Sequence, residues 1–364
     1  MKISIGSEIV EGPYGGGNEY LKNLSNFLKE KGHTVVHTLK DRDIDIILLT
    51  APFINSDTSS FSSCHVDYYQ KYINSEAISF HRINECDERK GTNRINKIIA
   101  QSNQNIDITF YVSRWLKDLY VNFGHTSNIA HVIKGGPTRQ IFNTTGKSYW
   151  DGKEKLSLVT HHWSSNYMKG FEEYLLLDKF LSDDIFSKKV SFTYIGNLPK
   201  NIEMPNTKII PPLYGKDLAE ELKKHHIYIT GSKNEPSGNH HMEGAMCGLP
   251  VLYVKSGALV EYCKDFGVEF SKNSIKEKIE LISSEYTFLT EKLNEYPYDF
   301  ESSATEILRV FEEAYKSKSV YSANRKNINQ FKILNTLLMF ETRKYLYNLY
   351  VQVRKKISKI KKFL

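Results

Sequence analysis

Two glutamates in the second half of the chain have the spacing best suited to chemistry. Glu235 and Glu243 are separated by seven residues, with Ser237, Gly238 and Asn239 between them. These three residue types are typical of a helix start, so the pair is expected at a junction between a loop and a helix. Free backbone amides there would donate to an anion or to sugar hydroxyls, and both carboxylates would face one cleft. A capping box with a surface glutamate produces the same pattern, so the spacing alone leaves both interpretations open.

The residues that follow this pair resemble those of a known family. After Glu243 the chain runs into a Gly-Leu-Pro segment ending at Pro250 and then into a small-residue turn, Ser256–Glu261. This order is similar to the E-x7-E signature of the family-4 retaining glycosyltransferases. The resemblance implies that Glu235 contacts the transferred sugar as a catalytic residue and that Glu243 binds the ribose of the nucleotide. It is strongest over residues 156–270 and covers about residues 1–318 altogether.

A second block of the resemblance lies in the loop expected after the first strand of the second half. Family members carry an arginine and a Lys-Gly pair there, and the arginine and the lysine both bind the diphosphate of the donor. Lys169 matches the lysine, but His161, His162 and Trp163 stand where the arginine is expected. A histidine carries only part of a charge at neutral pH. Either His162 donates a hydrogen bond to the phosphate as a neutral ring, or another part of the protein neutralises the negative charge of the donor diphosphate.

The histidines of this half could in principle bind zinc. His161 and His162 form one adjacent pair, and His240 and His241 form another. Adjacent pairs rarely converge on one ion, so we predict no metal. The resemblance implies no cofactor either, because cationic groups and helix amides would neutralise the diphosphate of the nucleotide-sugar substrate.

A glycine-rich turn follows the first expected strand. Gly15, Gly16, Gly17 and Asn18 join that strand to the first helix, whose start could meet a phosphate or an acceptor. Nicotinamide enzymes use such a turn too, but the G-x-G-x-x-G spacing and the acid expected on the second strand are absent. The acceptor-domain loop of the glycosyltransferase family fits better.

A stretch dense with charge, from Phe80 to Gly91, lies at the end of another expected strand. A solvated loop is one interpretation of it. The resemblance instead implies that His81 lies beside the reactive face of the donor sugar, as a catalytic residue. Arg82, Asn84 and Asp87 are then candidates to touch the sugar or to hold the residues that do.

Short apolar, β-branched runs alternate with amphipathic helical stretches, which is typical of parallel sheets covered by helices. The expected strands are 3–5, 35–37, 44–50, 77–80, 108–112, 131–133, 156–160, 191–195, 209–210, 227–230, 251–254 and 268–270. The expected helices are 18–31, 114–123, 171–181, 215–225, 239–247, 275–291 and 302–316. The predicted fold class is therefore α/β. It is a GT-B arrangement of two Rossmann-like domains facing each other across a cleft, with ligands at the carboxyl ends of the strands.

The length of 364 residues suits two domains. We predict an N-terminal acceptor-side domain over 1–145, a linker over 146–155 and a C-terminal nucleotide-sugar donor domain over 156–300. A helix over 301–320 could cross back to the first domain. A basic amphipathic helical tail is expected over 323–364.

The net charge of +7 is concentrated in that tail. The tail holds eleven Lys or Arg against one acid, Glu341, which leaves −3 for the rest of the chain. A nucleic-acid enzyme would show basic residues across its body, so no nucleic-acid partner is predicted. Apolar residues from Leu334 to Ile357 recur at helical spacing among the basic ones, which indicates an interfacial helix on anionic lipid. Packing against the body or a partner subunit is the alternative.

The four scattered cysteines, the lack of an apolar run long enough to span a membrane and the strand-like amino terminus favour a cytosolic location. Together these features predict a cytoplasmic, peripherally membrane-associated glycosyltransferase. It would move a sugar from a nucleotide diphosphate sugar to a glycan or lipid-linked saccharide, with retention of configuration, in cell-surface polysaccharide biosynthesis. Two alternatives stay open. One is a non-catalytic sugar-nucleotide-binding protein, because loss of the arginine would be consistent with loss of catalysis. The other is a GT-B-fold sugar-nucleotide epimerase.

Overall fold

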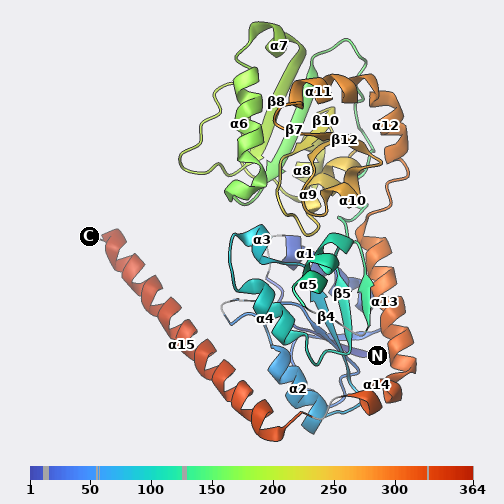
Figure 1. The fold of residues 1–364 in the computed structure, drawn as a ribbon, viewed down its shortest axis with the longest axis vertical. Coiled ribbons are helices and arrows are strands. Elements are labelled where there is room, and N and C mark those ends of the chain that lie inside the picture. Colours follow the sequence, from blue (N-terminus) through green and yellow to red (C-terminus); the bar gives the residue numbers. More distant parts are fainter. Residues whose placement is uncertain (11–15, 55, 57, 125–128, 326–327, 364) are drawn as a thin grey trace.

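A computed structural model describes the backbone of residues 1–10, 16–54, 56, 58–124, 129–325 and 328–363. Two six-stranded sheets lie one above the other in Figure 1, each flanked by helices. All neighbouring strands within each sheet are parallel. The α/β fold with two Rossmann-like units is therefore confirmed.

The first unit contains a sheet with the strand order β2-β1-β3-β4-β5-β6. Its elements are β1 (Lys2–Ile5), α1 (Gly16–Glu30), β2 (Thr34–Val36), β3 (Ile46–Leu49), α2 (Ser63–Tyr72), β4 (Ile78–Ile83), α3 (Asp87–Lys90), α4 (Ile95–Ser102), β5 (Ile108–Tyr111), α5 (Arg114–Asn122) and β6 (Ala130–Val132). The strand order reverses beside β1, where α1 begins, and ligands of such sheets gather at a reversal of this kind.

The second unit contains a sheet with the order β12-β11-β10-β7-β8-β9. Its elements are β7 (Leu156–His162), α6 (Phe171–Phe180), α7 (Asp184–Lys189), β8 (Val190–Gly196), β9 (Lys208–Ile210), α8 (Gly215–Leu222), β10 (Ile227–Thr230), α9 (Asn239–Met246), β11 (Val251–Val254), α10 (Leu259–Cys263), β12 (Gly267–Phe270), α11 (Ile275–Ser284) and α12 (Tyr286–Leu293). The reversal here lies between β7 and β10, so the loops after these two strands are the expected ligand loops.

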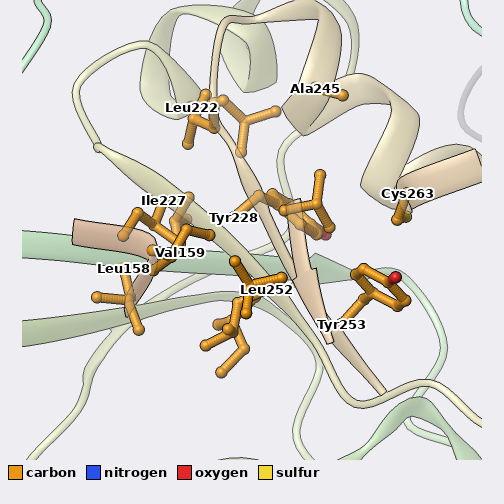
Figure 2. Packing of buried hydrophobic residues seen from close by; sticks show 14 of the residues in the cluster. Leu158, Val159, Leu222, Ile227, Tyr228, Ala245, Leu252, Tyr253 and Cys263 are labelled. Carbon is orange, nitrogen blue, oxygen red and sulfur yellow. The ribbon is translucent and has the colours of Figure 1, made fainter. Parts of the chain in front are cut away.

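The strands are short apolar runs because both faces of each sheet are covered. Every residue of β3 and of β10 is buried, and a strand buried on both faces reads as a continuous apolar run. In the second unit, Figure 2 shows Leu158 and Val159 of β7, Ile227 of β10 and Leu252 of β11 in one buried cluster. This packing holds β7 and β10 side by side and so brings their following loops together.

The chain returns to the first unit after the second sheet. The last three helices are α13 (Phe300–Lys316), α14 (Lys318–Asn324) and α15 (Gln330–Phe363). Phe311 of α13 packs against Phe80 and Phe110 of the first sheet, with ring centroids 4.6 and 6.0 Å apart. Farther on, Arg325 forms an ion pair at 2.8 Å with Asp107, whose side chain is 6% exposed. These contacts fasten the C-terminal elements to the first sheet.

The first turns of α15 pack against α2 of the first unit. Ile333 is buried, Glu341 lies 2.8 Å from His65 Nε2, and Lys344 Nζ donates to the Ser59 carbonyl at 2.9 Å. Figure 1 shows that α15 begins beside α2 and runs away from the rest of the molecule toward the C-terminus. The part of α15 that follows the Lys344 contact is called its projecting part below. The predicted tail, 323–364, therefore contains the end of α14 and the helix α15, which has a docked first part and a projecting second part.

Every predicted strand is present among the described residues, with ends shifted by at most three positions. Two shifts matter for the site. β4 continues to Ile83 and β7 to His162, so His81, His161 and His162 lie in strands rather than in loops. The stretch 275–291, predicted as one helix, is divided between α11 and α12. The sequence pattern did not predict α2, α3, α4, α7 or α10.

Candidate active site

A cleft of about 700 Å³ opens between the two units, at the carboxyl ends of strands from both sheets. The predicted site residues that line it are Gly16, Gly17, His162, Lys169, Glu235, Ser237, Gly238, Asn239 and Glu243. The charged stretch after β4 contributes Arg82, Asn84, Glu85, Arg89 and Lys90 to the opposite wall. Residues far apart in sequence thus converge on one space.

Glu235 lies in the loop between β10 and α9, and a neighbouring turn fixes its backbone. Ala258 N–H donates to the Glu235 carbonyl at 2.8 Å. Gly257 has φ +58°, and a Cβ at this position would lie 2.4 Å from Glu235 N. The close approach needs a glycine, which explains the small-residue turn after β11. Asn234 adopts φ 52°, an uncommon value for a residue with a side chain, immediately before Glu235.

The Glu235 carboxylate is buried between two cations. Lys169 Nζ donates to Oε1 at 2.6 Å, and Arg89 Nε donates to Oε2 at 2.7 Å. Glu235 is 3% exposed. Burial opposes its ionisation, but Lys169 and Arg89 outweigh burial and hold the pKa of the carboxyl below its ordinary value. Glu235 is therefore an ionised acceptor at neutral pH.

A tight turn after β7 positions Lys169. A short 3₁₀ turn, Tyr167–Lys169, is capped by Asn166, whose side chain accepts from Met168 N–H at 2.8 Å. Gly170 follows with φ +99°, where a Cβ would lie 2.4 Å from the Gly231 carbonyl carbon. The Lys-Gly pair is thus explained by close packing of two ligand loops.

The start of α9 forms one wall of the cleft. Gly238 precedes the helix with φ +83°, and Asn239 is its first residue. Ser237 is held by two contacts: its hydroxyl lies 3.3 Å from Tyr262 Oη, and its carbonyl accepts from His241 Nε2 at 2.8 Å. The amides at this helix start are suited to an anionic or hydroxyl-bearing ligand.

Glu243 lies one turn into α9 and pairs with a histidine of β7. His161 Nε2 is 2.6 Å from Glu243 Oε2, and Tyr228 Oη is 3.1 Å from His161 Nδ1. His161 therefore fixes the orientation of this carboxylate.

His162 forms part of the cleft floor as a neutral ring. Burial lowers its pKa well below the ordinary value. Its Nε2 lies 2.8 Å from Tyr174 Oη, and that hydroxyl also accepts from Gly231 N–H. The Tyr174 hydroxyl also lies 3.2 Å from Thr160 Oγ1, so it can donate either to that oxygen or to His162 Nε2. Within the described part of the chain, Nδ1 is buried without a partner.

The structure corrects the prediction for His81. Its ring is 1% exposed within β4, Nδ1 is 2.8 Å from Asn103 Oδ1, and it does not line the cleft. Side chains alternate between the faces of a strand, and His81 lies on the α4 face. Arg82, the next residue, lies on the cleft side with its guanidinium 4.2 Å from the centroid of Tyr20. His81 is therefore placed to support the sheet, not to touch a sugar.

The prediction for Asn18 is also corrected, whereas Asp87 makes supporting contacts, which were one of its two predicted roles. Asn18 exchanges two hydrogen bonds with the backbone of Val10, at 2.7 and 2.9 Å, and so anchors α1 instead of facing the cleft. Asp87 accepts from the N–H groups of Ile95 and Asn96 and so caps α4. Gly15 lies outside the described residues.

Arg89 is the site residue that sequence reasoning missed. It belongs to α3, which lies in the first unit, yet its side chain reaches Glu235 in the second. The charged stretch that contains it was recognised, but nothing in the spacing distinguished Arg89 from its charged neighbours. Only the arrangement of the two units singles it out.

In this structure His161 Nε2 faces Glu243 and His162 Nε2 faces Tyr174. Among the described residues, no group of three or more His, Cys, Asp or Glu side chains is placed to hold an ion. The absence of a metal from the reaction stays a prediction.

Comparisons with known proteins reveal the fold. No protein-family model and no curated sequence matches the chain. Sucrose-phosphate synthase from Thermosynechococcus elongatus superposes with a TM-score of 0.62 at 11% identity, covering 87% of this chain and 99% of its own. HepE from Anabaena, solved in complex with UDP and glucose, gives 0.60 at 11% identity over 85% and 99%. A glycosyltransferase from Rickettsia africae gives 0.61 at 12% identity over 86% and 98%. The chain therefore has the GT-B fold that these glycosyltransferases share.

Proposed function

We propose that this protein is a glycosyltransferase that transfers a hexose-type sugar from a nucleoside diphosphate sugar. One observation carries the proposal: the ionised carboxylate of Glu235 is held between Lys169 and Arg89 in the cleft, eight positions before Glu243. A carboxylate and two cations in one buried space suit a ligand with both hydroxyls and phosphates. HepE, which shares the fold, has been solved with UDP-glucose.

The proposed roles follow from the contacts. Transfer breaks the bond between the anomeric carbon and the phosphate oxygen, so negative charge grows on the departing diphosphate. Lys169 and the amides at the start of α9 would stabilise that charge. Glu235 would accept hydrogen bonds from sugar hydroxyls, and Glu243, oriented by His161, would accept them from the ribose. Protein cations thus provide the neutralisation, and we propose transfer without a metal cofactor.

The resemblance to family-4 enzymes supports retention of configuration at the anomeric carbon. The acceptor that we propose is a growing glycan or a lipid-linked saccharide of cell-surface polysaccharide biosynthesis.

Incubation with a panel of nucleotide sugars tests the function. Thermal shift identifies the donor that binds, and chromatography then measures nucleoside diphosphate released with and without saccharide acceptors. Release that increases with an acceptor supports the proposal. Binding without release would instead reveal a non-catalytic binder, and conversion of the donor to an isomeric sugar nucleotide would reveal an epimerase.

We also propose that the projecting part of α15 binds the cytoplasmic membrane surface. Its exposed apolar side chains include Tyr345, Leu349, Tyr350, Val353 and Ile357. Arg354 and Lys356 lie among them. An apolar stripe flanked by cations binds anionic lipid through both burial and charge. In the described part of the chain, no helix is sufficiently long and apolar to cross a membrane.

Co-sedimentation with vesicles tests this membrane role. The matched truncation ends at Lys344, because the contacts of Ile333, Glu341 and Lys344 with the body are then preserved. The full chain should sediment with vesicles containing phosphatidylglycerol and not with pure phosphatidylcholine, whereas the truncated chain should stay in solution. Equal sedimentation of both proteins would contradict the proposal.

A further inference from the structure

The charged side chains at the centre of the cleft carry an excess of positive charge. Lys169 and Arg89 share one acid, Glu235. His162 adds no charge because burial keeps its pKa well below the ordinary value. A buried group of two cations and one anion favours the binding of a further anion.

Arg89 uses only part of its guanidinium on Glu235. The contact runs through Nε, at 2.7 Å, and among the described residues neither terminal nitrogen of Arg89 has a hydrogen-bond partner. Those two nitrogens carry four of the five N–H donors, in a planar fork that suits phosphate oxygens. Lys169 Nζ donates to the other Glu235 oxygen at 2.6 Å, and within the described ranges its two other N–H donors have no partner.

Contacts on both sides hold Arg89 in this place. Asn234, beside Glu235, donates from Nδ2 to the carbonyl of Glu88 at 3.2 Å. This hydrogen bond joins the loop between β10 and α9 to α3. On the other side of α3, Asp87 accepts from backbone N–H groups at the start of α4. Arg89 itself is 9% exposed. It is therefore a buried, positioned cation and not a mobile surface arginine.

We infer that Arg89, reaching across from the first unit, supplies the second diphosphate cation that the loop after β7 lacks. This inference rests on the proposed function, because it takes the anion to be the diphosphate of the donor. Before the donor binds, Glu235 keeps Arg89 and Lys169 close together despite their like charges. When the donor binds, its phosphates take the free N–H donors of both cations, and the remaining lone pairs of the Glu235 oxygens accept from sugar hydroxyls. Because Arg89 belongs to the first unit and Lys169 to the second, binding of the diphosphate then also requires contact between the two units.

Calorimetric titration of Arg89→Gln with UDP, GDP and ADP and with their nucleosides tests the inference. The diphosphate that binds wild type most tightly should bind the variant about 10- to 100-fold more weakly, the usual loss for a charged hydrogen bond. The matching nucleoside should bind both proteins equally. Arg94→Gln is the matched control, since Arg94 is an exposed residue outside the cleft lining, and it should bind like wild type. Arg89→Lys, which keeps the charge without the fork, should recover part of the loss.

A second comparison separates contact with phosphate from mere support of Glu235. In a Glu235→Gln background, Arg89→Gln should still weaken diphosphate binding by about the same factor. If the second substitution has no further effect, Arg89 acts only through Glu235 and the inference is wrong. Unchanged diphosphate affinity in Arg89→Gln alone would overturn it equally, while leaving the proposed function intact. If wild type binds none of the three diphosphates, the proposed function itself fails.

Discussion

Gly257→Ala should damage the site without replacing any residue that contacts a ligand. Gly257 has φ +58°, and an added methyl group would lie 2.4 Å from Glu235 N and 2.6 Å from its carbonyl oxygen. An ordinary contact begins at 3.4 Å, so the Glu235 backbone must move by about 1 Å. A displacement of that size at a reacting centre lowers kcat by about 100-fold. The left-handed backbone adds a stability loss of roughly 1–2 kcal/mol.

A matched glycine separates the two effects. Gly32 has φ +84° and open space around the position of a Cβ, so Gly32→Ala carries the backbone cost alone. Thermal denaturation should show a loss of a few degrees for both variants, at about 2–4 °C for each kcal/mol. Release of nucleoside diphosphate from the donor should fall only in Gly257→Ala. If both variants keep wild-type turnover, the contact between this turn and Glu235 does not position the active site.

Three further predictions concern charge, burial and pH. Lys169→Ala should weaken nucleoside diphosphate binding by about 1.5–3 kcal/mol in calorimetry and leave nucleoside binding unchanged; equal losses for both would contradict a phosphate contact. His81→Asn should lower the free energy of unfolding by about 1–3 kcal/mol, because a buried hydrogen bond with Asn103 is broken, and should leave kcat near wild type. A fall in kcat at unchanged stability would restore the catalytic role. Burial lowers the pKa of His241 to about 4, so its neutral form stabilises the fold above pH 6.5 and that stability is lost as the pH falls toward 4. At pH 5 the loss is roughly 2 kcal/mol, and His241→Gln should remove this part of the pH dependence of denaturant unfolding.

Much of the fold and the donor wall of the site could be predicted from the sequence. Apolar runs bounded by loops located the strands because each sheet is buried on both faces. Lys169 and Glu235 follow β7 and β10, which are neighbours in the sheet, so loops identified from the chain pattern had to meet in space. Gly257 and Gly170 occupy positions that only a glycine can fill without strain.

The opposite wall could not be predicted in the same way. His81 and Arg82 are adjacent, and which of them faces the cleft depends on the face of β4 to which each belongs. The predicted strand ended at Phe80, three residues before the end of β4. His81 and Arg82 were therefore assigned to a loop, and the alternation of side chains between the two faces of a strand was not applied to them. Arg89 depends on the contact between two units, which no spacing within the chain encodes. The helix α2 was missed because its sequence, with three tyrosines and a histidine, has little helical periodicity.

The central claim is that Glu235 and its two cations form the catalytic site of a sugar transferase. Steady-state turnover of the donor by wild type and by Glu235→Gln tests it most directly, with nucleoside diphosphate binding as the check on folding. We predict that Glu235→Gln keeps nucleoside diphosphate binding while kcat falls by about 100-fold, the scale of losing a positioned catalytic contact. A Glu235→Gln enzyme that binds the diphosphate and turns over the donor at the wild-type rate would contradict the account.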